Sequence, residues 1–421
     1  MHRLMRRWCG GMICCPWCTK CVDIVPKQII LLYALTFLVF LPLICFNLRH
    51  SLYHLRLHDA DEEETHLMTE NDKRLVENGQ IIKKYNESVI QNSQSGPSLH
   101  SEDMDVGITV ITVSRNRHRK GGYRPQYLTQ VVGRLLGLLN STAKHSKLKY
   151  GLFVCNVDDH PETYDELKPL KILLPTFQMY QLKQDTKIDI FEKEKRDYIF
   201  CLEETLKRNA LYAFLVEDDG YPHKDLIPVL ERTIDSHIEQ KAVSEFSPKV
   251  LPRNVTYVKF YHPERLLGYI NAEWERIPEL ISVSFVFGTL MTILYAHFIL
   301  QWTRHNIRMM WFACVLYCGL VALFVGRVNL MELRRVSVQT YQVTSAPSCC
   351  TPAMLFPKQG GYEIVKRLSA VTCKRRYGKD TALEDIRRRY GYTALMVQPN
   401  LFKHIGLFSS LRKGIIDPFI V

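Results

Sequence analysis

Three stretches of the chain are long and apolar enough to cross a lipid bilayer. Residues 29–48, 280–300 and 309–328 each come near the roughly 20 apolar residues that a hydrocarbon core needs. No small-residue cleavage site follows the first stretch, so we predict an uncleaved transmembrane signal anchor. Only residues 301–308 separate the other two, which predicts a transmembrane helical hairpin. Two buried core helices of a soluble domain are the alternative interpretation of this pair.

Elsewhere, apolar runs alternate with helical patterns. The runs at residues 106–113, 150–157 and 211–216 are short and mostly apolar, which is typical of strands buried on both faces. Helical spacing appears at residues 127–139 and 191–209, between these runs. The alternation predicts an α/β fold with a largely parallel sheet. Such sheets bind ligands beyond the carboxyl ends of their strands.

The basic residues indicate how the chain is oriented. The 421 residues include 55 Lys and Arg against 43 Asp and Glu. Basic side chains precede the first apolar stretch and acidic ones follow it, so residues 1–28 are predicted to be a cytosolic tail. Residues 49–104 are polar and form a predicted lumenal stem, partly helical and partly disordered. Residues 301–308 are then a cytosolic loop. Residues 105–279 and 329–421 lie together in the lumen, as two parts of one domain that the hairpin interrupts.

The predicted lumenal compartment has chemical consequences. It excludes nucleic acid as a partner of the basic residues. Three Asn-x-Ser/Thr sequons are expected to carry glycans, at Asn86, Asn140 and Asn254. Disulfides persist in this compartment. Spacing does not establish which cysteines pair, and the pairs we adopt are Cys155 with Cys201 and Cys350 with Cys373. The cysteine cluster of the cytosolic tail is interpreted as palmitoylated or without a role, rather than as a zinc site.

Acidic residues follow the third predicted strand. Glu217, Asp218 and Asp219 lie at its carboxyl end, and the repulsion among three carboxylates favours a hard divalent cation, Mn²⁺ or Mg²⁺. Such an ion bridges a diphosphate and neutralises the charge that develops on a leaving nucleotide. A plain Asp-Asp-Gly turn is the alternative.

The end of the first predicted strand points to the same class of ligand. Val113, Ser114 and Arg115 are predicted donor-binding residues, because a guanidinium group grips a phosphate with two hydrogen bonds. No glycine-rich phosphate loop follows this strand, which disfavours a P-loop or dinucleotide-binding fold. Together with a signal anchor and a stem, these features favour a metal-dependent nucleotide-sugar transferase of the secretory pathway.

Five segments of the chain carry a resemblance to a known family. They are residues 191–198, 216–219, 261–265, 349–357 and 399–412. In this order they resemble the Golgi transferases that add N-acetylgalactosamine to the mannose of glycosylphosphatidylinositol (GPI) anchors. The similarity to N-acetylglucosaminyltransferase IV is more distant. The resemblance covers residues 106–412 and implies a GT-A-like glycosyltransferase domain interrupted by a transmembrane hairpin.

The resemblance also implies a reaction. UDP-N-acetylgalactosamine (UDP-GalNAc) is the expected donor, and the anchor mannose of GPI-anchored proteins in the Golgi membrane is the expected acceptor. The expected product is a β1,4 linkage formed with inversion, which requires a general base. Asp380 stands where that base usually lies, although a helix N-cap explains an Asp there equally well. A non-enzymatic glycan-binding or scaffold membrane protein is the competing function.

The other implied site residues surround the acidic triplet. Asp219 is the expected main metal ligand, and Asp218 is expected to face the ribose or a metal-bound water. The family motif usually begins with Asp, where this chain has Glu217. His404 is implied as a ligand of the metal or the diphosphate, although a lone His is more often structural. Two residues are implied to contact the nucleobase or sugar of the donor, Asp197 and Tyr198.

Overall fold

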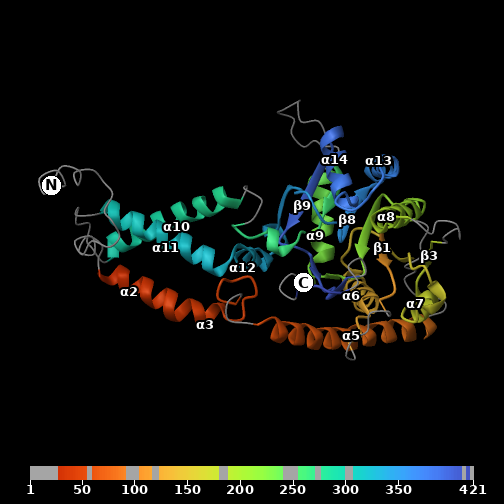
Figure 1. Ribbon diagram of the computed structural model, residues 1–421, viewed down its shortest axis with the longest axis horizontal. Helices are drawn as coiled ribbons and strands as arrows, with labels where there is room; N and C mark the ends of the chain where they lie inside the picture. The colour runs from red at the N-terminus through yellow and green to blue at the C-terminus, as the bar shows by residue number, and fades with distance from the viewer. Residues whose placement is uncertain are drawn as a thin grey trace, which may run out of the picture. The chain divides into compact units, whose positions relative to one another are not determined.

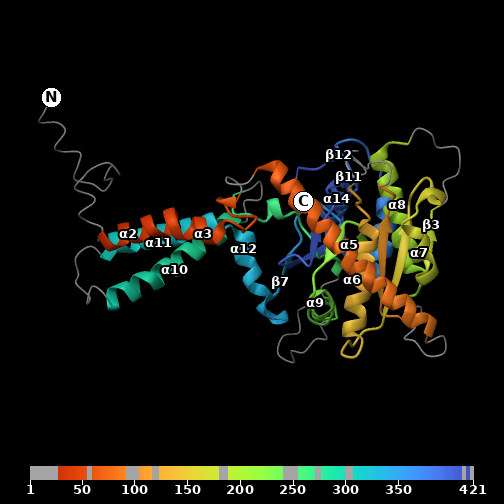
Figure 2. The same cartoon turned by 90° about the horizontal axis from the view of Figure 1, so that it is seen from below.

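The structure is a computed structural model, and its chain divides into two compact units (Figures 1 and 2). One unit comprises Met1–Asp59 and Glu264–Leu333, and the other comprises Ala60–Pro263 and Arg334–Val421. The residues that the structure describes are 27–54, 59–91, 104–115, 123–179, 188–239, 255–270, 276–298, 307–409 and 414–417. The cysteine cluster of the predicted cytosolic tail and Asn254 lie outside these described residues.

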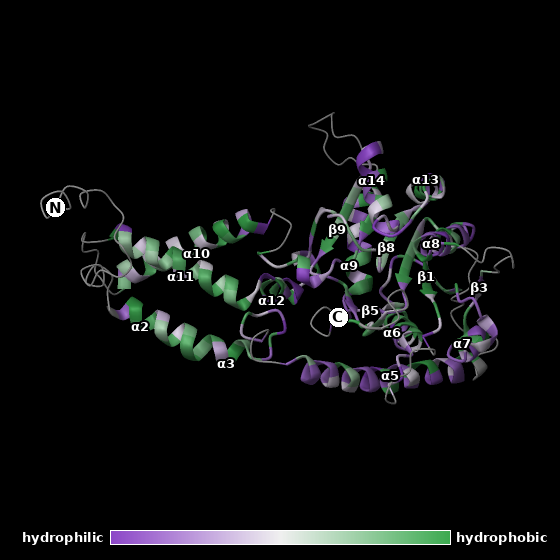
Figure 3. Ribbon diagram, in the orientation of Figure 1, coloured by the Kyte–Doolittle hydropathy of each residue, from purple (hydrophilic) through white to green (hydrophobic). Residues whose placement is uncertain are grey.

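The first unit contains three apolar helical segments, drawn largely in the hydrophobic colour in Figure 3. They are Gln28–Cys45, made of α2 (Lys27–Leu35), η2 (Thr36–Phe40) and α3 (Leu41–Cys45), then α10 (Arg276–Phe298) and α11 (Ile307–Val325). Leu38 and Val286 are 76% and 63% exposed, which buried core helices of a soluble domain would not show. All three segments are long and apolar enough to cross a membrane.

A close glycine contact joins α10 to α11. Gly288 faces the backbone of Val315, and a Cβ atom added to this glycine would lie 2.4 Å from the Val315 Cα atom. Such contacts are typical of helices that pack within membranes. The predicted span of residues 309–328 runs past the end of α11, because Gly326 has a φ of 89° and precedes the short helix α12 (Arg327–Met331).

The second unit is built on an eight-stranded sheet with the order β3-β2-β1-β4-β8-β6-β9-β7. The strands are β1 (Val106–Thr112), β2 (Tyr150–Asn156), β3 (Thr176–Gln178), β4 (Tyr212–Glu217), β6 (Val255–Lys259), β7 (Gln342–Ser345), β8 (Ala353–Pro357) and β9 (Thr393–Gln398). The first four in spatial order are parallel, β8 is antiparallel to both neighbours, β9 is parallel to β6, and β7 is antiparallel to β9. The predicted α/β fold with a mostly parallel sheet is confirmed.

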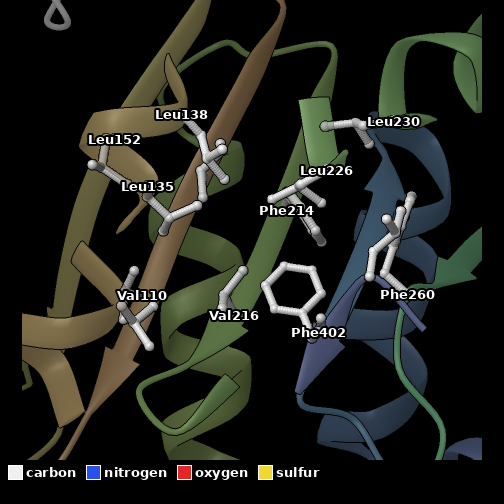
Figure 4. Close-up of a cluster of buried hydrophobic side chains, with 14 of the residues drawn as sticks. Val110, Leu135, Leu138, Leu152, Phe214, Val216, Leu226, Leu230, Phe260 and Phe402 are labelled. Atoms are coloured by element: carbon white, nitrogen blue, oxygen red, sulfur yellow. The ribbon is translucent and has the colours of Figure 1, made fainter. Parts of the chain in front are cut away.

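Different helices cover the two faces of the sheet. The helices α6 (Tyr127–Thr142) and α9 (Leu226–Thr233) pack with the main apolar core, to which Val110, Phe214 and Phe402 contribute (Figure 4). Alternate residues of β1 point to the other face. There Gly107 approaches Thr205 of α8 (Ile190–Leu206). The helices α13 (Lys358–Ser369) and α14 (Lys379–Tyr390) pack against α8 and continue this second layer.

The predicted stem contains a long helix that belongs to the second unit. The helix α5 (Ala60–Gln91) has 32 residues and packs along α6 (Figure 2). The carbonyl oxygen of Asn78 comes so close to Gly133 that an added Cβ atom would lie 2.6 Å from it. Asn71 and Asn78 are buried in this interface. The helical pattern in the sequence is weak because polar side chains occupy part of the buried face.

The structure also places several of the predicted modification sites. Cys155 on β2 bonds to Cys201 on α8, which is the pairing named from the sequence. The second predicted pair is wrong, because Cys350 bonds to its neighbour Cys349 and Cys373 is a buried free thiol. The Cys373 backbone N–H donates to Glu192 of α8 at 2.7 Å, which ties Cys373 to that helix. Of the sequons, Asn86 is half-buried on α5 and Asn140 is exposed near the end of α6.

Candidate active site

A pocket of about 520 Å³ opens at the carboxyl ends of β1, β2 and β4. Parallel strands bring their carboxyl ends to one edge of the sheet, so residues far apart in sequence meet there. The pocket is lined by all the predicted donor and metal residues, namely Val113, Ser114, Arg115, Asp197, Tyr198, Glu217, Asp218, Asp219 and His404. Asp380 directly follows another lining residue, Lys379.

One wall of the pocket, which we call the strand-end wall, consists of Arg115, Asp218, Asp219 and His404. Since β4 is buried and ends at Glu217, the two aspartates come directly after it. The chain then enters β5 (Gly220–Pro222), which pairs antiparallel with β10 (Phe402–His404). This pairing sets His404 opposite Gly220, and His404 Nε2 lies 3.5 Å from Asp219 Oδ2.

Arg115 holds the two aspartates together. Its Nη2 donates to Asp218 Oδ1 at 2.6 Å and to Asp219 Oδ2 at 2.9 Å. Its Nη1 donates to the carbonyl oxygen of Phe408. Asp218 also accepts from the Thr112 hydroxyl at 2.8 Å. These charge-assisted bonds make Arg115 the counter-ion of the acidic pair in this structure, and its contact with a phosphate stays a prediction.

Asp219 retains a carboxylate oxygen for a ligand. Its Oδ1 is buried and has no hydrogen-bond partner within the described parts of the chain. Burial opposes ionisation, but the charges of Arg115 and His404 outweigh it and hold the pKa of Asp219 below its usual range. Burial alone would lower the pKa of His404. The negative charge of the Asp219 carboxylate outweighs burial, so the pKa is raised above its ordinary value. A buried ionised oxygen without a donor suits a divalent cation.

The opposite wall, which we call the helix wall, comes from α8 and the start of α14. It comprises Lys193, Glu194, Asp197, Tyr198 and Lys379. Asp197 accepts from Lys193 Nζ at 2.8 Å through Oδ2, whereas Oδ1 is buried and unpartnered among the residues described. Burial raises the pKa of Asp197 to about 6, although the charge of Lys193 opposes the shift. The Tyr198 hydroxyl is likewise buried with no partner in the described structure.

A buried lysine links the helix wall to the end of β4. Lys379 Nζ lies 2.7 Å from Glu194 Oε1 and 2.9 Å from Glu217 Oε1. It also lies over the Tyr198 ring, 5.1 Å from the centroid. Burial lowers the pKa of Lys379, but the two carboxylates outweigh this effect and raise it well above the ordinary value. Lys379 therefore stays charged and balances two acids at the edge of the pocket.

Asp380 lies in the first turn of α14, beside the loop that carries the Cys349–Cys350 disulfide. Its carboxylate accepts from the Cys350 N–H at 3.1 Å and from the Thr351 hydroxyl at 3.2 Å. The same hydroxyl lies 3.2 Å from Glu217 Oε1. The N-cap of α14 is Gly378, so the alternative role of Asp380 as an N-cap does not hold. Its role as a general base stays a prediction.

Comparison with known families adds the decisive observation. A family model described as GPI-N-acetylgalactosamine transferase PGAP4 matches residues 106–403, which is more than half of the chain. The chain belongs to this family. The resemblance inferred from the five sequence segments is thereby confirmed. In this GPI-N-acetylgalactosamine transferase the matched region begins at β1 and ends within β10, so it includes most of the pocket residues. The helix α5 precedes the matched region.

Sequence reasoning missed part of the transferase pocket. Asp158 follows β2, and its Oδ2 accepts from the Ser114 N–H at 2.8 Å. The strand-end argument that identified Asp218 would also have identified Asp158. Lys379, which also lines the pocket, offered no comparable signal, because its contacts depend on where α14 packs.

Proposed function

We propose that this chain transfers N-acetylgalactosamine from UDP-GalNAc to the mannose of GPI-anchor glycans on GPI-anchored proteins, in β1,4 linkage and with inversion. Its family supports the activity. The observation that carries the proposal of a metal-dependent nucleotide-sugar site is the buried Asp219 Oδ1, which lacks a partner in the described residues and belongs to a pocket-lining residue. The sheet order supports a GT-A-like domain, since the parallel strands β1, β2 and β4 present their carboxyl ends to this pocket.

The strand-end wall fits a divalent cation. Asp219, with His404 beside it, would hold Mn²⁺ or Mg²⁺ through its free oxygen. When bound, the ion neutralises negative charge on the diphosphate of the donor. Asp218 is engaged by Arg115 and Glu217 by Lys379, so direct ligation by these two acids stays a prediction. The protein contributes an ionised Asp219 carboxylate, because the positive charge of Arg115 stabilises its charged form.

The helix wall is proposed to hold the nucleoside of the donor. Asp197 Oδ1 is positioned to accept from an N–H of the nucleobase, and the Tyr198 hydroxyl can donate or accept. Both groups are buried, so leaving them without a ligand has a free-energy cost that donor binding removes.

Asp380 is the proposed general base. It takes the proton of the acceptor hydroxyl as that oxygen bonds to the anomeric carbon of N-acetylgalactosamine and the bond from this carbon to the UDP oxygen breaks. The Cys350 N–H and the Thr351 hydroxyl hold the carboxylate in place. Lys379 neutralises Glu194 and Glu217, which limits repulsion among the acids around the donor.

The sheet also supports the proposed membrane topology. β6 and β9 are neighbours, although α10 and α11 lie between them in the chain. A bilayer cannot divide a hydrogen-bonded sheet, so two crossings between these strands return the chain to the same side. The pairing supports one side for both parts of the domain; that this side is the Golgi lumen, with the N-terminus in the cytosol, is part of the proposal. An acceptor anchored by lipid presents its mannose near that membrane.

The test is transfer by the purified full-length protein. UDP-GalNAc, UDP-N-acetylglucosamine and UDP-galactose are each offered with a GPI-anchored acceptor. The released anchor glycans are then analysed by mass spectrometry and linkage-specific glycosidases. We expect addition from UDP-GalNAc, with β1,4 linkage to mannose. Addition from another donor instead would contradict the donor assignment. No addition from any donor by the folded protein would favour the glycan-binding or scaffold alternative.

A further inference from the structure

One face of α5 contacts three places that support the strand-end wall. The first contact is apolar. Leu67 is buried in a cluster with Tyr123, Leu407 and Phe408. The Phe408 carbonyl oxygen accepts from Arg115 Nη1, and the Tyr127 hydroxyl lies 3.2 Å from the Phe408 nitrogen. Leu67 thus belongs to the same apolar cluster as the residue whose backbone fixes the counter-ion of both aspartates.

The second contact is an ion pair next to His404. Glu70 Oε2 lies 3.1 Å from Lys403 Nζ on β10, one residue before His404. Arg74 Nη1 lies 3.2 Å from the same Glu70 oxygen. Burial opposes ionisation, but the charge of Lys403 outweighs it and lowers the pKa of Glu70, so the pair is charged at neutral pH. The pair is half-exposed and weak by itself, but it ties α5 to the strand that presents His404.

The third contact lies on β5, directly after the acidic residues. Asn78 is 1% exposed, and its Nδ2 donates to the Tyr221 hydroxyl at 3.2 Å. Two guanidinium groups lie over the Tyr221 ring, with their Cζ atoms at 5.9 Å (Arg74) and 5.8 Å (Arg134) from its centroid. Arg134 Nε donates to the Pro222 carbonyl oxygen at 3.3 Å. This polar packing fixes the strand that leaves Asp219.

The spacing of these residues shows that they act as one surface. Leu67, Glu70, Arg74 and Asn78 recur every three or four positions, which places them on one side of a helix. The same side carries Asn71, which accepts from Gln130 Nε2 at 2.7 Å and donates to the Arg124 carbonyl oxygen at 2.9 Å. A helix is stiff over this length, so its contacts constrain β5, β10 and residue 408 together.

We propose that α5 is a positioning element of the active site rather than a spacer between the membrane anchor and the transferase domain. It holds β5, β10 and Phe408, and through them Asp219, His404 and Arg115, in the geometry that receives the donor. The catalytic consequence rests on the proposed function, whereas the positioning itself does not.

The experiment compares full-length variants in detergent by hydrogen–deuterium exchange, with no ligand added. Leu67→Ala and Asn78→Ala remove side chains from the side of α5 that contacts the strand-end wall supports. Glu70→Gln is a milder change on the same side of the helix. Val76→Ala is the matched control, because Val76 is 60% exposed on the same helix. We expect about tenfold faster exchange in peptides covering residues 217–222 and 402–409 of Leu67→Ala and Asn78→Ala. Exchange in β8 should not change.

A second readout separates positioning from stability. In Glu70→Gln we expect the donor KM to rise severalfold while the melting temperature stays within about 2 °C of the wild type. If a larger substitution unfolds the whole domain, Glu70→Gln carries the test. Exchange at residues 217–222 and 402–409 that matches Val76→Ala in all three variants would overturn the proposal. If exchange changes as expected but the wild-type protein transfers no sugar, the proposed function fails and the positioning role stands.

Discussion

Asp219 and Asp197 are the same residue type, buried in the same pocket, and their pKa values move in opposite directions. Arg115 and His404 overcome burial at Asp219 and lower its pKa. At Asp197 burial prevails over the charges of Lys193 and Lys379 and raises the pKa to about 6. Each residue has one carboxylate oxygen without a partner in the described structure. The surroundings, not the residue type, therefore set the two carboxylates apart, and this difference underlies the proposal that Asp219 binds a cation and Asp197 binds a hydrogen-bond donor of the nucleotide.

The largest effect should come from removing the charge on the strand-end wall. We expect Asp219→Asn to lower kcat/KM about 1000-fold, because the leaving diphosphate loses its main electrostatic support. Chelation should abolish wild-type transfer, and added Mn²⁺ should restore it. Asp235→Asn is the control, because Asp235 is exposed on the π-helical segment η5 (Ile234–Ile238), which does not line the pocket. Transfer by Asp219→Asn at the wild-type rate would contradict the proposal that Asp219, unlike Asp197, holds the cation.

The next effect concerns the base beside the helix wall. We expect Asp380→Asn to lower kcat about 100-fold and to leave donor binding unchanged, because only proton removal from the acceptor is lost. Asp385→Asn is the matched control, since Asp385 is exposed on the same helix α14. Donor affinity is measured by titration with UDP, and turnover by product formation. Normal turnover in Asp380→Asn would assign the base to another residue.

A smaller effect should follow from Asp197→Asn, with a characteristic dependence on pH. We expect the donor KM of this variant to rise about tenfold, which corresponds to about 1.4 kcal/mol. In the wild type the raised pKa means that the carboxylate gains a proton as the pH falls through about 6, loses its charge and becomes a weaker acceptor. The wild-type donor KM should therefore increase below pH 6, and the Asn variant should lack this increase. An unchanged KM profile would exclude Asp197 from the donor site.

The smallest effect should come from the hydroxyl shared between Glu217 and Asp380. Thr351→Val removes a hydrogen bond worth about 1 kcal/mol, so we expect kcat to fall about fivefold with little change in donor KM. Thr351→Ser keeps the hydroxyl and should restore most of the rate. If Ser and Val behave alike, packing rather than the hydroxyl accounts for the effect.

The strand-end wall was largely predictable from the sequence, because a strand buried on both faces leaves a local signal. The predicted strands at residues 106–113, 150–157 and 211–216 correspond within one residue at each end to β1, β2 and β4. The residues that follow them were therefore identified correctly as pocket residues. The partners of those residues were not, since Arg115 was expected on a phosphate and lies on Asp218 and Asp219.

The helix wall and α5 were harder to predict because their contacts are long-range and polar. Lys379 meets Glu194 and Glu217 only after β8 has paired with β4 and α14 has packed on α8. The buried face of α5 includes Asn71 and Asn78, which a search for apolar periodicity does not register. Family resemblance supplied the candidate role of Asp380, which neither periodicity nor spacing reveals.

The position of α10 and α11 within the chain also imposes an order on biosynthesis. β4 and β6 emerge from the ribosome before these two apolar helices, whereas β8, which pairs with both strands, emerges after them. Until β8 is made, the facing edges of β4 and β6 have unpaired backbone groups that invite wrong pairing. The sheet of the nascent domain therefore stays incomplete while the two apolar helices are synthesised and inserted. Chaperones are expected to protect it during that interval.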